Sequence, residues 1–324
     1  IVPIAGVGSR LRPHTYHIPK ALLPLAGKPM VSYIVEQLLS WEIEHIVFVI
    51  GHLGEMIQEY LRKTYPEVSM EFRVQEKPLG LGHAVLTGLD PEDGEVVILL
   101  GDTILDTDLT PYLQKGKTAL GVAQVEDPRR FGVVVVENQR VIKLVEKPAE
   151  PISQLALVGI YLIRSGKELS RAIKEVMERG ITVKGEYQLT DALGLLLEWG
   201  EEMVTFPVEG WYDCGKVDTL LATQRFLFNK IDTFTLPEVC EDSLIVQPVH
   251  FSSGVRVIRS VVGPYVTLGE RCTIENSVLQ DAIIGEEVHL GGLVIRNSLI
   301  GRRVKLNKSP WELNLGASSE GVVG

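Results

Sequence analysis

The chain opens with Ile1-Val2-Pro3-Ile4-Ala5-Gly6-Val7-Gly8-Ser9-Arg10-Leu11-Arg12-Pro13. The first five residues are apolar and predict a buried strand, which breaks at once into a glycine-containing loop. The residues before Glu36 include no Asp or Glu, although the whole chain has a formal net charge of −10. Glycines let backbone N–H groups close on phosphate oxygens, and the cations Arg10, Arg12, Lys20 and Lys28 follow. This basic loop in an acidic protein therefore indicates an anion-binding site.

The loop does not fit either of the two common phosphate-binding patterns. The Rossmann fingerprint needs a third glycine three residues after the second, and this chain has Leu11 there. The Walker A loop ends in Gly-Lys-Ser or Gly-Lys-Thr, whereas Ser9 and Arg10 follow Gly8 here. Alone, Gly-x-Gly is equally compatible with a plain tight turn, so the rest of the sequence has to decide.

The segments after the loop alternate between helical and strand patterns. Apolar spacing predicts a helix over residues 31–41, a strand over 45–50, a helix over 55–65 and a strand over 70–74. Alternation at this spacing predicts parallel strands joined by crossover helices. Ligands of such sheets bind at the carboxyl ends of the strands, where the glycine loop would lie.

Two aspartates follow apolar segments further along the chain. The run 95–100 is the strongest strand candidate, and Asp102 follows it at the expected sheet edge. Asp213 belongs to a short polar and aromatic segment, Gly210 to Gly215, which is expected to be a turn. Taken alone, either aspartate could simply cap a helix or a turn.

The opening loop and its continuation carry a specific resemblance. The motifs GVGSRLRP at 6–13 and PKALLPLAGKP at 19–29 resemble the signature of the sugar-1-phosphate nucleotidyltransferases. Ser9 stands where the family usually has Thr, which keeps a hydroxyl. The resemblance implies an α/β, Rossmann-like domain with a mostly parallel sheet, and Mg²⁺ as cofactor. It also implies transfer of a nucleotidyl group from dTTP or UTP to a sugar 1-phosphate, with glucose 1-phosphate expected, giving an NDP-sugar and pyrophosphate.

The resemblance also implies a role for individual residues. The implied catalytic residues are Arg10, Lys20, Asp102, Lys147 and Asp213. The implied nucleotide-binding residues are Ala5, Gly6, Gly8, Ser9, Gln75 and Gly80. The implied sugar-binding residues are Gly132, Glu146, Lys147, Leu157 and Trp211. Asp102 and Asp213 would be the metal ligands, while Glu186 is a further sugar-site candidate and Asp191 is expected to be structural.

The choice of nucleotide depends on the segment around Gln75. A glutamine side chain has both a donor and an acceptor and can pair with the imide edge of a pyrimidine. The form Leu-Gly-Leu-Gly-His-Ala-Val at 79–85 is more similar to enzymes that use UTP or dTTP, and His83 is expected to start a helix. Two alternatives stay open: a GTP-dependent mannose-1-phosphate guanylyltransferase, and a non-catalytic regulatory homologue. The second is disfavoured because a silent copy has no chemical need for all five catalytic residues.

The pattern of apolar residues and glycines changes after about residue 243. Steps such as Val262-Gly263 and Ile284-Gly285 recur, and Val262, Leu268 and Ile274 are six residues apart. This spacing resembles the hexapeptide repeat of left-handed β-helices. We therefore predict a catalytic domain over 1–235, a left-handed β-helix over 243–308 and a tail over 309–324 pinned by Trp311. With a β-helix, the chain is most similar to the long-form glucose-1-phosphate thymidylyltransferases.

The β-helix raises one further alternative. Several hexapeptide proteins are acyltransferases, which place a catalytic histidine and coenzyme A between coils. His250 and His289 are the histidines of this segment, and neither has a recognisable setting. Oligomerisation or regulation is the preferred role, and a homo-oligomer is expected.

Composition limits the remaining classes. The 324 residues are 45% hydrophobic but contain no apolar run long enough for a membrane span, and no signal peptide is evident at the start. The three cysteines are scattered, which favours a reducing cytoplasm and neither a disulfide framework nor a zinc site. The acidic balance disfavours nucleic acid as a partner. The expected partners are a nucleoside triphosphate and a sugar 1-phosphate.

Overall fold

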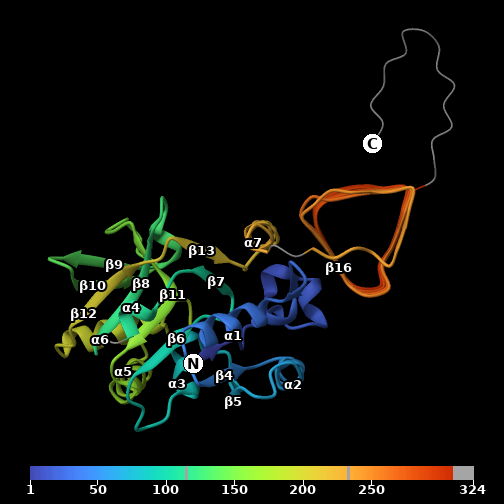
Figure 1. Cartoon of the computed structure of the whole chain (residues 1–324). Helices are drawn as coiled ribbons and strands as arrows, with labels where there is room; N and C mark the ends of the chain where they lie inside the picture. The colour runs from blue at the N-terminus through green and yellow to red at the C-terminus, as the bar shows by residue number, and fades with distance from the viewer. Residues whose placement is uncertain (114–115, 232–233, 309–324) are drawn as a thin grey trace. The chain divides into compact units, whose positions relative to one another are not determined.

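A computed structural model describes residues 1–113, 116–231 and 234–308 (Figure 1). The chain divides into two compact units, Ile1–Thr223 and Gln224–Gly324. The predicted tail over 309–324, with Trp311, lies outside the described residues. None of the described helices is long and apolar enough to cross a membrane.

The first sheet of the N-terminal unit is parallel, as predicted, in the order β1-β4-β5. Its strands are β1 (Val2–Pro3), β4 (His45–Ile50) and β5 (Ser69–Val74). The neighbouring helices are α1 (Met30–Ser40), α2 (Gly54–Thr64) and α3 (Leu81–Gly88). The expected helices and strands are therefore confirmed to within a few residues, and α1 begins directly after Pro29, whose extended backbone precedes the first helical residue, Met30.

The second sheet has the order β10-β9-β11-β8-β12, with β6 paired to β11. Its strands are β6 (Val96–Leu99), β8 (Thr118–Gln124), β9 (Gly132–Glu137), β10 (Arg140–Glu146), β11 (Leu155–Ile163) and β12 (Met203–Pro207). Only β12 with β8 is parallel in this sheet, and the other pairs are antiparallel. The parallel prediction thus holds for the first sheet but not for most of the second. For β9 and β10 the reason is visible at Asn138 and Gln139, whose positive φ values make the two-residue turn of a hairpin.

The predicted turn at Gly210 to Gly215 is wrong. Residues Gly210–Asp213 form strand β13, which pairs antiparallel with β7 (Thr103–Asp106). A four-residue strand that pairs, within the described residues, with one other short strand has no long alternating pattern that can be detected in the sequence. The pairing matters because it sets Asp213 opposite Thr103, the residue after Asp102.

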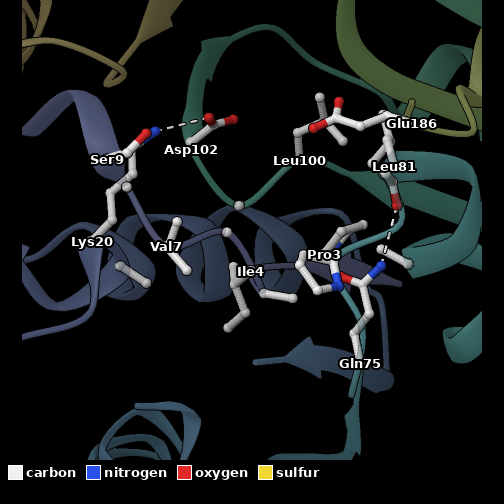
Figure 2. Close-up of a pocket in the computed structure, with 18 of the residues that line it drawn as sticks. Pro3, Ile4, Val7, Ser9, Lys20, Gln75, Leu81, Leu100, Asp102 and Glu186 are labelled. Atoms are coloured by element: carbon white, nitrogen blue, oxygen red, sulfur yellow. Dashed lines mark hydrogen bonds and ion pairs between the residues drawn. The ribbon is translucent and has the colours of Figure 1, made fainter. Parts of the chain in front are cut away.

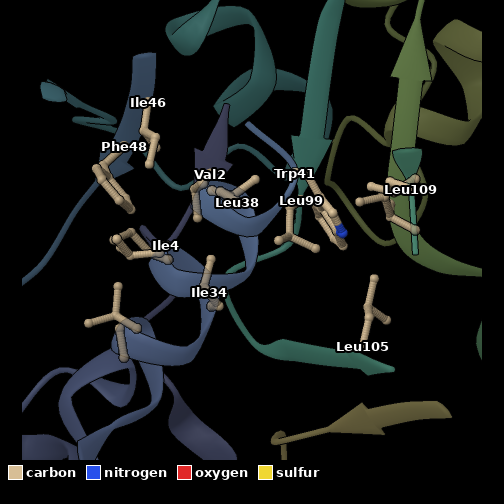
Figure 3. Close-up of a cluster of buried hydrophobic side chains, with 14 of the residues drawn as sticks. Val2, Ile4, Ile34, Leu38, Trp41, Ile46, Phe48, Leu99, Leu105 and Leu109 are labelled. Carbon is tan, nitrogen blue, oxygen red and sulfur yellow. The ribbon is translucent and has the colours of Figure 1, made fainter. Parts of the chain in front are cut away.

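Buried apolar side chains hold the first sheet against its helices (Figure 3). Val2 and Phe48 come from adjacent strands, and Ile34 and Leu38 come from one face of α1; all four are at most 2% exposed. Burying an aliphatic or aromatic side chain of this size contributes about 1.5–3 kcal/mol. This core fixes the ends of β1 and β6, from which the glycine loop and Asp102 continue. The remaining helices are α4 (Thr110–Leu113), α5 (Gly166–Glu178), α6 (Leu189–Glu198) and α7 (Val217–Phe228).

The C-terminal unit contains a parallel β-helix with the triangular outline seen in Figure 1. One ladder contains β14 (Val239–Glu241), β17 (Arg256–Ile258), β20 (Thr273–Glu275), β22 (His289–Gly291) and β24 (Lys305–Asn307). The other strands are β15 (Leu244–Ile245), β16 (Val249–Phe251), β18 (Val261–Val262), β19 (Val266–Leu268), β21 (Val278–Ile284) and β23 (Val294–Ile300). Val257, Ile274 and Leu290 lie in register and are fully buried. The repeat of inward aliphatic residues therefore builds the stacked coils that the sequence predicted.

Candidate active site

The glycine loop leaves β1 and continues into a single 3₁₀ turn over Ser9–Leu11. Gly8 has φ of +62°, in the left-handed region that favours glycine. A Cβ at Gly8 would lie 3.0 Å from Thr15 Cγ2 and 3.2 Å from Lys20 Cβ. Thr15 Oγ1 also donates a hydrogen bond of 2.9 Å to the Gly8 carbonyl. The loop backbone is therefore held tightly against the segment that carries Lys20.

A cavity of about 460 Å³ opens beside this loop (Figure 2). The structure brings together every residue predicted to bind the nucleotide, although they are up to 75 residues apart in sequence. Those lining residues are Ala5, Gly6, Gly8, Ser9, Gln75 and Gly80. Three of the predicted catalytic residues, Arg10, Lys20 and Asp102, line the same cavity. Glu186, which the sequence offered as a candidate for the sugar site, lies here instead.

Lys20 and Asp102 form the central ion pair of the cavity. Lys20 Nζ lies 2.8 Å from Asp102 Oδ2, and the Lys20 side chain is 12% exposed. Burial alone would raise the pKa of Asp102, but the charge and hydrogen bond of Lys20, helped by Arg10 and Thr103, hold it below its ordinary value. The carboxylate is therefore ionised at neutral pH and presents oxygen atoms to the cavity.

Asp213 reaches the same region from β13. The Cys214 N–H donates to the Asp102 carbonyl at 2.9 Å, which ties the end of β13 to the residue that precedes β7. A Cβ placed on Gly215 would lie 2.9 Å from both Asp213 Oδ1 and Arg10 Nη2. Arg10 and Asp213 therefore converge on one point next to Asp102.

Two carboxylates of this kind fit a magnesium site in which the substrate supplies further ligands. Magnesium is usually bound by one or two carboxylates, with phosphate oxygens and water completing the coordination. Within the described residues, no group of three or more His, Cys, Asp or Glu side chains is placed to hold a metal by itself. Asp102 and Asp213 are thus suited to a metal that arrives with a phosphate, and not to a closed structural site.

The residues predicted to bind the sugar form a separate group on β9, β10 and β11. A Cβ on Gly132 would lie 2.7 Å from Thr190 Oγ1, 3.0 Å from Glu146 Oε2 and 3.0 Å from Leu157 Cδ1. Gly132, Glu146 and Leu157 therefore meet at one point, as expected of residues that share a ligand. None of these three residues lines the cavity beside the glycine loop.

Lys147 and Trp211 flank this group. Lys147 Nζ lies 2.7 Å from Glu146 Oε1, and the Lys147 N–H donates to the Phe131 carbonyl at 2.9 Å. Lys147 adopts a left-handed φ of +45°, which is uncommon for a residue with a side chain and turns the chain just after β10. The Trp211 ring packs edge-on against Phe131, with centroids 5.0 Å apart. Phe131 therefore connects both predicted residues through one aromatic and one backbone contact.

The structure adds Thr190 and Asp191, at the start of α6, to this group. Thr190 Oγ1 donates to Glu146 Oε2 at 2.7 Å, a contact that the sequence did not predict. Asp191 Oδ2 is buried and has no hydrogen-bond partner among the described residues. Burial and the charge of Glu146 raise the pKa of Asp191, and Lys147 only partly opposes them. The sole sequence signal was the pair of polar residues at a helix start, which is equally typical of capping.

Comparison with known proteins gives this geometry its context. The Nucleotidyl transferase family profile matches residues 1–230, so the chain belongs to that family. A low-salt glycan biosynthesis nucleotidyltransferase, Agl11 of Haloferax volcanii, is 35% identical over 94% of this chain and 92% of its own length. Glucose-1-phosphate thymidylyltransferase of Streptomyces griseus is 31% identical over 96% of this chain and 94% of its own.

A solved structure agrees with these sequence relatives. A glucose-1-phosphate thymidylyltransferase from Bacillus anthracis, crystallised with sucrose, superposes with a TM-score of 0.60 at 30% identity. The match covers 72% of this chain and 95% of that one. The chain is a sugar-1-phosphate nucleotidyltransferase, and the sequence resemblance is confirmed at the level of the family.

Proposed function

We propose that this enzyme transfers a nucleotidyl group from dTTP or UTP to glucose 1-phosphate and releases pyrophosphate. The observation that carries the proposal is the cavity that joins the glycine loop, Gln75 and the Lys20–Asp102 pair. Relatives named glucose-1-phosphate thymidylyltransferase support both the sugar and the pyrimidine nucleotide. A guanylyltransferase is the remaining alternative for the base, and the segment at 79–85 weighs against it.

In the proposed reaction, a phosphate oxygen of the sugar 1-phosphate attacks the α-phosphorus of the nucleotide in line. The new P–O bond forms as the bond to the β-phosphate oxygen breaks, and the electron pair leaves with pyrophosphate. No covalent enzyme intermediate is needed, so catalysis consists of positioning and charge stabilisation. Arg10 and Lys20 would stabilise the leaving pyrophosphate, and Lys147 would hold the attacking phosphate as a point charge.

Asp102 and Asp213 are the residues that would hold magnesium in this reaction. Enzymes of this family generally use a divalent metal, and bound magnesium would neutralise charge on the nucleotide phosphates. The Asp102 carboxylate is ionised and already lies among Lys20, Arg10 and Asp213. Arg10 and Lys20 would keep the phosphate chain oriented around these two carboxylates.

We also propose that the enzyme is a homo-oligomer. A row of aliphatic side chains faces outward across four coils of the β-helix, at Leu244, Val261, Val278 and Val294. Leu244 is 58% exposed and Val294 is 71% exposed, which is typical of a surface that another molecule covers. Light scattering on the purified chain tests this proposal, since a monomer would contradict it.

The reaction itself is tested by identifying its product. Mass spectrometry of a mixture of enzyme, dTTP, glucose 1-phosphate and magnesium should show dTDP-glucose, and UTP should give UDP-glucose. Formation of GDP-mannose alone from a full panel would keep the reaction type and overturn the proposed substrates.

A further inference from the structure

Gln75 is held by two contacts that both use the same end of its side chain. Its Nε2 donates to the Gly80 carbonyl at 3.2 Å, a contact drawn in Figure 2, and lies 2.9 Å from His83 Nδ1. A carbonyl oxygen can only accept a hydrogen bond, so the Gly80 contact fixes which end of the amide is the nitrogen. The Gln75 side chain is therefore locked in one of its two amide orientations.

The second contact fixes the state of His83. Since the Gln75 nitrogen is a donor, His83 Nδ1 has to accept, and the ring proton lies on Nε2. Burial lowers the pKa of the His83 imidazole below its ordinary value, which keeps the ring neutral at pH 7. A protonated ring would place two donors against each other, so the neutral ring and this amide orientation support one another.

These contacts leave one end of the amide for a ligand. Both Nε2 hydrogens of Gln75 are engaged, whereas its Oε1 accepts no hydrogen bond from any residue in the described part of the chain. Gln75 lines the cavity and is 9% exposed, so a ligand would meet a single, fixed acceptor. An acceptor pairs with a base that carries a ring N–H next to its carbonyl groups. Uracil, thymine and guanine have this hydrogen, whereas cytosine and adenine have a lone pair at the equivalent position.

We infer that His83 is a positioning residue that accepts the second Nε2 hydrogen of Gln75, so that Gln75 offers a ligand only its acceptor oxygen, and that the cavity thereby selects uracil or thymine nucleotides over cytosine nucleotides. The inference rests on the proposed function, because it assigns the base of the nucleotide substrate to the region of Gln75. His83 acts through the orientation of Gln75 and needs no contact with the nucleotide. The sequence alone predicts only a helix start at His83, and His83 does lie within the first turn of α3.

The test compares UTP with CTP in the wild-type enzyme and in two His83 variants. His83→Leu replaces the ring that carries the acceptor by an apolar side chain, and His83→Asn is the matched control because Asn Oδ1 can replace Nδ1 as acceptor. The ratio of kcat/KM for UTP to that for CTP is measured with glucose 1-phosphate. Equilibrium binding of both nucleotides is measured by calorimetry on the same proteins.

We expect the wild-type enzyme to prefer UTP by on the order of 100-fold or more. His83→Leu should lower that preference by about tenfold, the usual effect of one hydrogen bond, and His83→Asn should retain it. An unchanged preference in His83→Leu, or equal use of CTP by the wild type, would overturn the inference. The wild-type comparison stands even if a variant fails to fold.

The two measurements separate this inference from the proposed reaction. Selective binding of UTP that depends on His83, without turnover of any sugar 1-phosphate, would refute the reaction and uphold the inference. Normal turnover with a preference that His83→Leu does not change would uphold the reaction and refute the inference.

Discussion

Thr190 Oγ1 donates a hydrogen bond of 2.7 Å to Glu146 Oε2 and so connects the start of α6 with the end of β10. Lys147 occupies the other carboxylate oxygen at 2.7 Å, and the Glu146 side chain is only 9% exposed. A carboxylate held at both oxygens has one orientation in which it can accept hydrogen bonds from sugar hydroxyls. Thr190 is thus expected to act on the sugar through Glu146.

Thr190→Val should raise the KM for sugar 1-phosphate by about tenfold, because it removes one hydrogen bond to Glu146 without changing the side-chain shape. Thr190→Ser keeps the hydroxyl and should stay near the wild-type value. Steady-state kinetics with each substrate varied in turn provides the measurement. A rise in the KM for the nucleotide instead of the sugar phosphate would contradict the assignment.

Asp102→Asn and Asp213→Asn should each lower kcat by on the order of 10²–10³-fold, because each removes charge from the site where phosphate charge is redistributed. Titration of magnesium should show a weaker dependence of the rate on the metal in both variants. Asp108→Asn is the matched control, since that carboxylate is exposed and accepts a hydrogen bond from the Thr110 N–H outside the cavity. A variant that carries both substitutions and keeps full activity and unchanged magnesium dependence would refute the assignment of Asp102 and Asp213 as metal ligands.

Gly80→Ala should weaken nucleotide binding and lower stability. Gly80 has φ of +109°, and a Cβ there would lie 2.6 Å from the Tyr187 carbonyl oxygen and 2.7 Å from the Tyr187 nitrogen. Backbone atoms cannot move away cheaply, so either the loop that joins Gln75 to Gly80 or the segment that carries Glu186 and Tyr187 would have to shift. Calorimetric binding of UTP and thermal unfolding together measure the effect.

Gly194→Ala serves as the control for that substitution. Gly194 lies inside α6, and a Cβ there would meet nothing within 4 Å. Replacing a helical glycine by alanine should stabilise the protein by about 0.5–1 kcal/mol. If both substitutions had the same effect on nucleotide binding, the close approach of Gly80 to Tyr187 would not explain the weaker binding in Gly80→Ala.

A structural feature of this enzyme could be predicted from the sequence when the residues that form it lie close together in the chain. The glycine loop and the basic segment after it are contiguous, so they could be identified as a motif, and the cavity contains all of the predicted nucleotide residues. The antiparallel pairing of β9 with β10 was missed, although Asn138 and Gln139 offered a turn signal. Strand β13 was misread as a turn because the pairing that defines it in the described part of the chain is with β7, which is about 100 residues away.

The residues predicted to bind the sugar show the same limit of prediction from sequence. The contact between Thr190 and Glu146 joins residues 44 positions apart on elements of different type. No periodicity or spacing connects a helix start with a strand end, so this contact required the folded chain. The roles assigned to Gly132, Glu146, Lys147, Leu157 and Trp211 stay predictions, although the structure places three of them around one point.

Stability should depend on pH through Glu201. Its side chain is 11% exposed and accepts hydrogen bonds from Thr118 Oγ1 at 2.7 Å and from Arg164 Nη2 at 2.6 Å. Burial alone would raise the pKa of Glu201, but the hydrogen bonds and charge of Arg164 and Thr118 bring it below its ordinary value. A carboxyl whose pKa is lower in the folded state stabilises the protein above its unfolded pKa. That contribution is lost as the pH falls through the folded pKa.

Glu201→Gln should therefore lower the free energy of unfolding by about 1–2 kcal/mol at pH 7. The difference from wild type should narrow only below about pH 4.5, the ordinary pKa of a glutamate. Urea denaturation of both proteins at several pH values measures the two curves. A difference that stays constant down to pH 3.5 would show that the charge of Glu201 is not what stabilises the fold.

We propose above that the enzyme joins a pyrimidine nucleotide to a sugar 1-phosphate. The most direct test of this claim is the release of pyrophosphate with each of dTTP, UTP, GTP and ATP against a panel of sugar 1-phosphates, with and without magnesium. We predict magnesium-dependent release with dTTP or UTP and glucose 1-phosphate, and little with GTP or ATP. Folded protein that releases no pyrophosphate with any pair would contradict the claim.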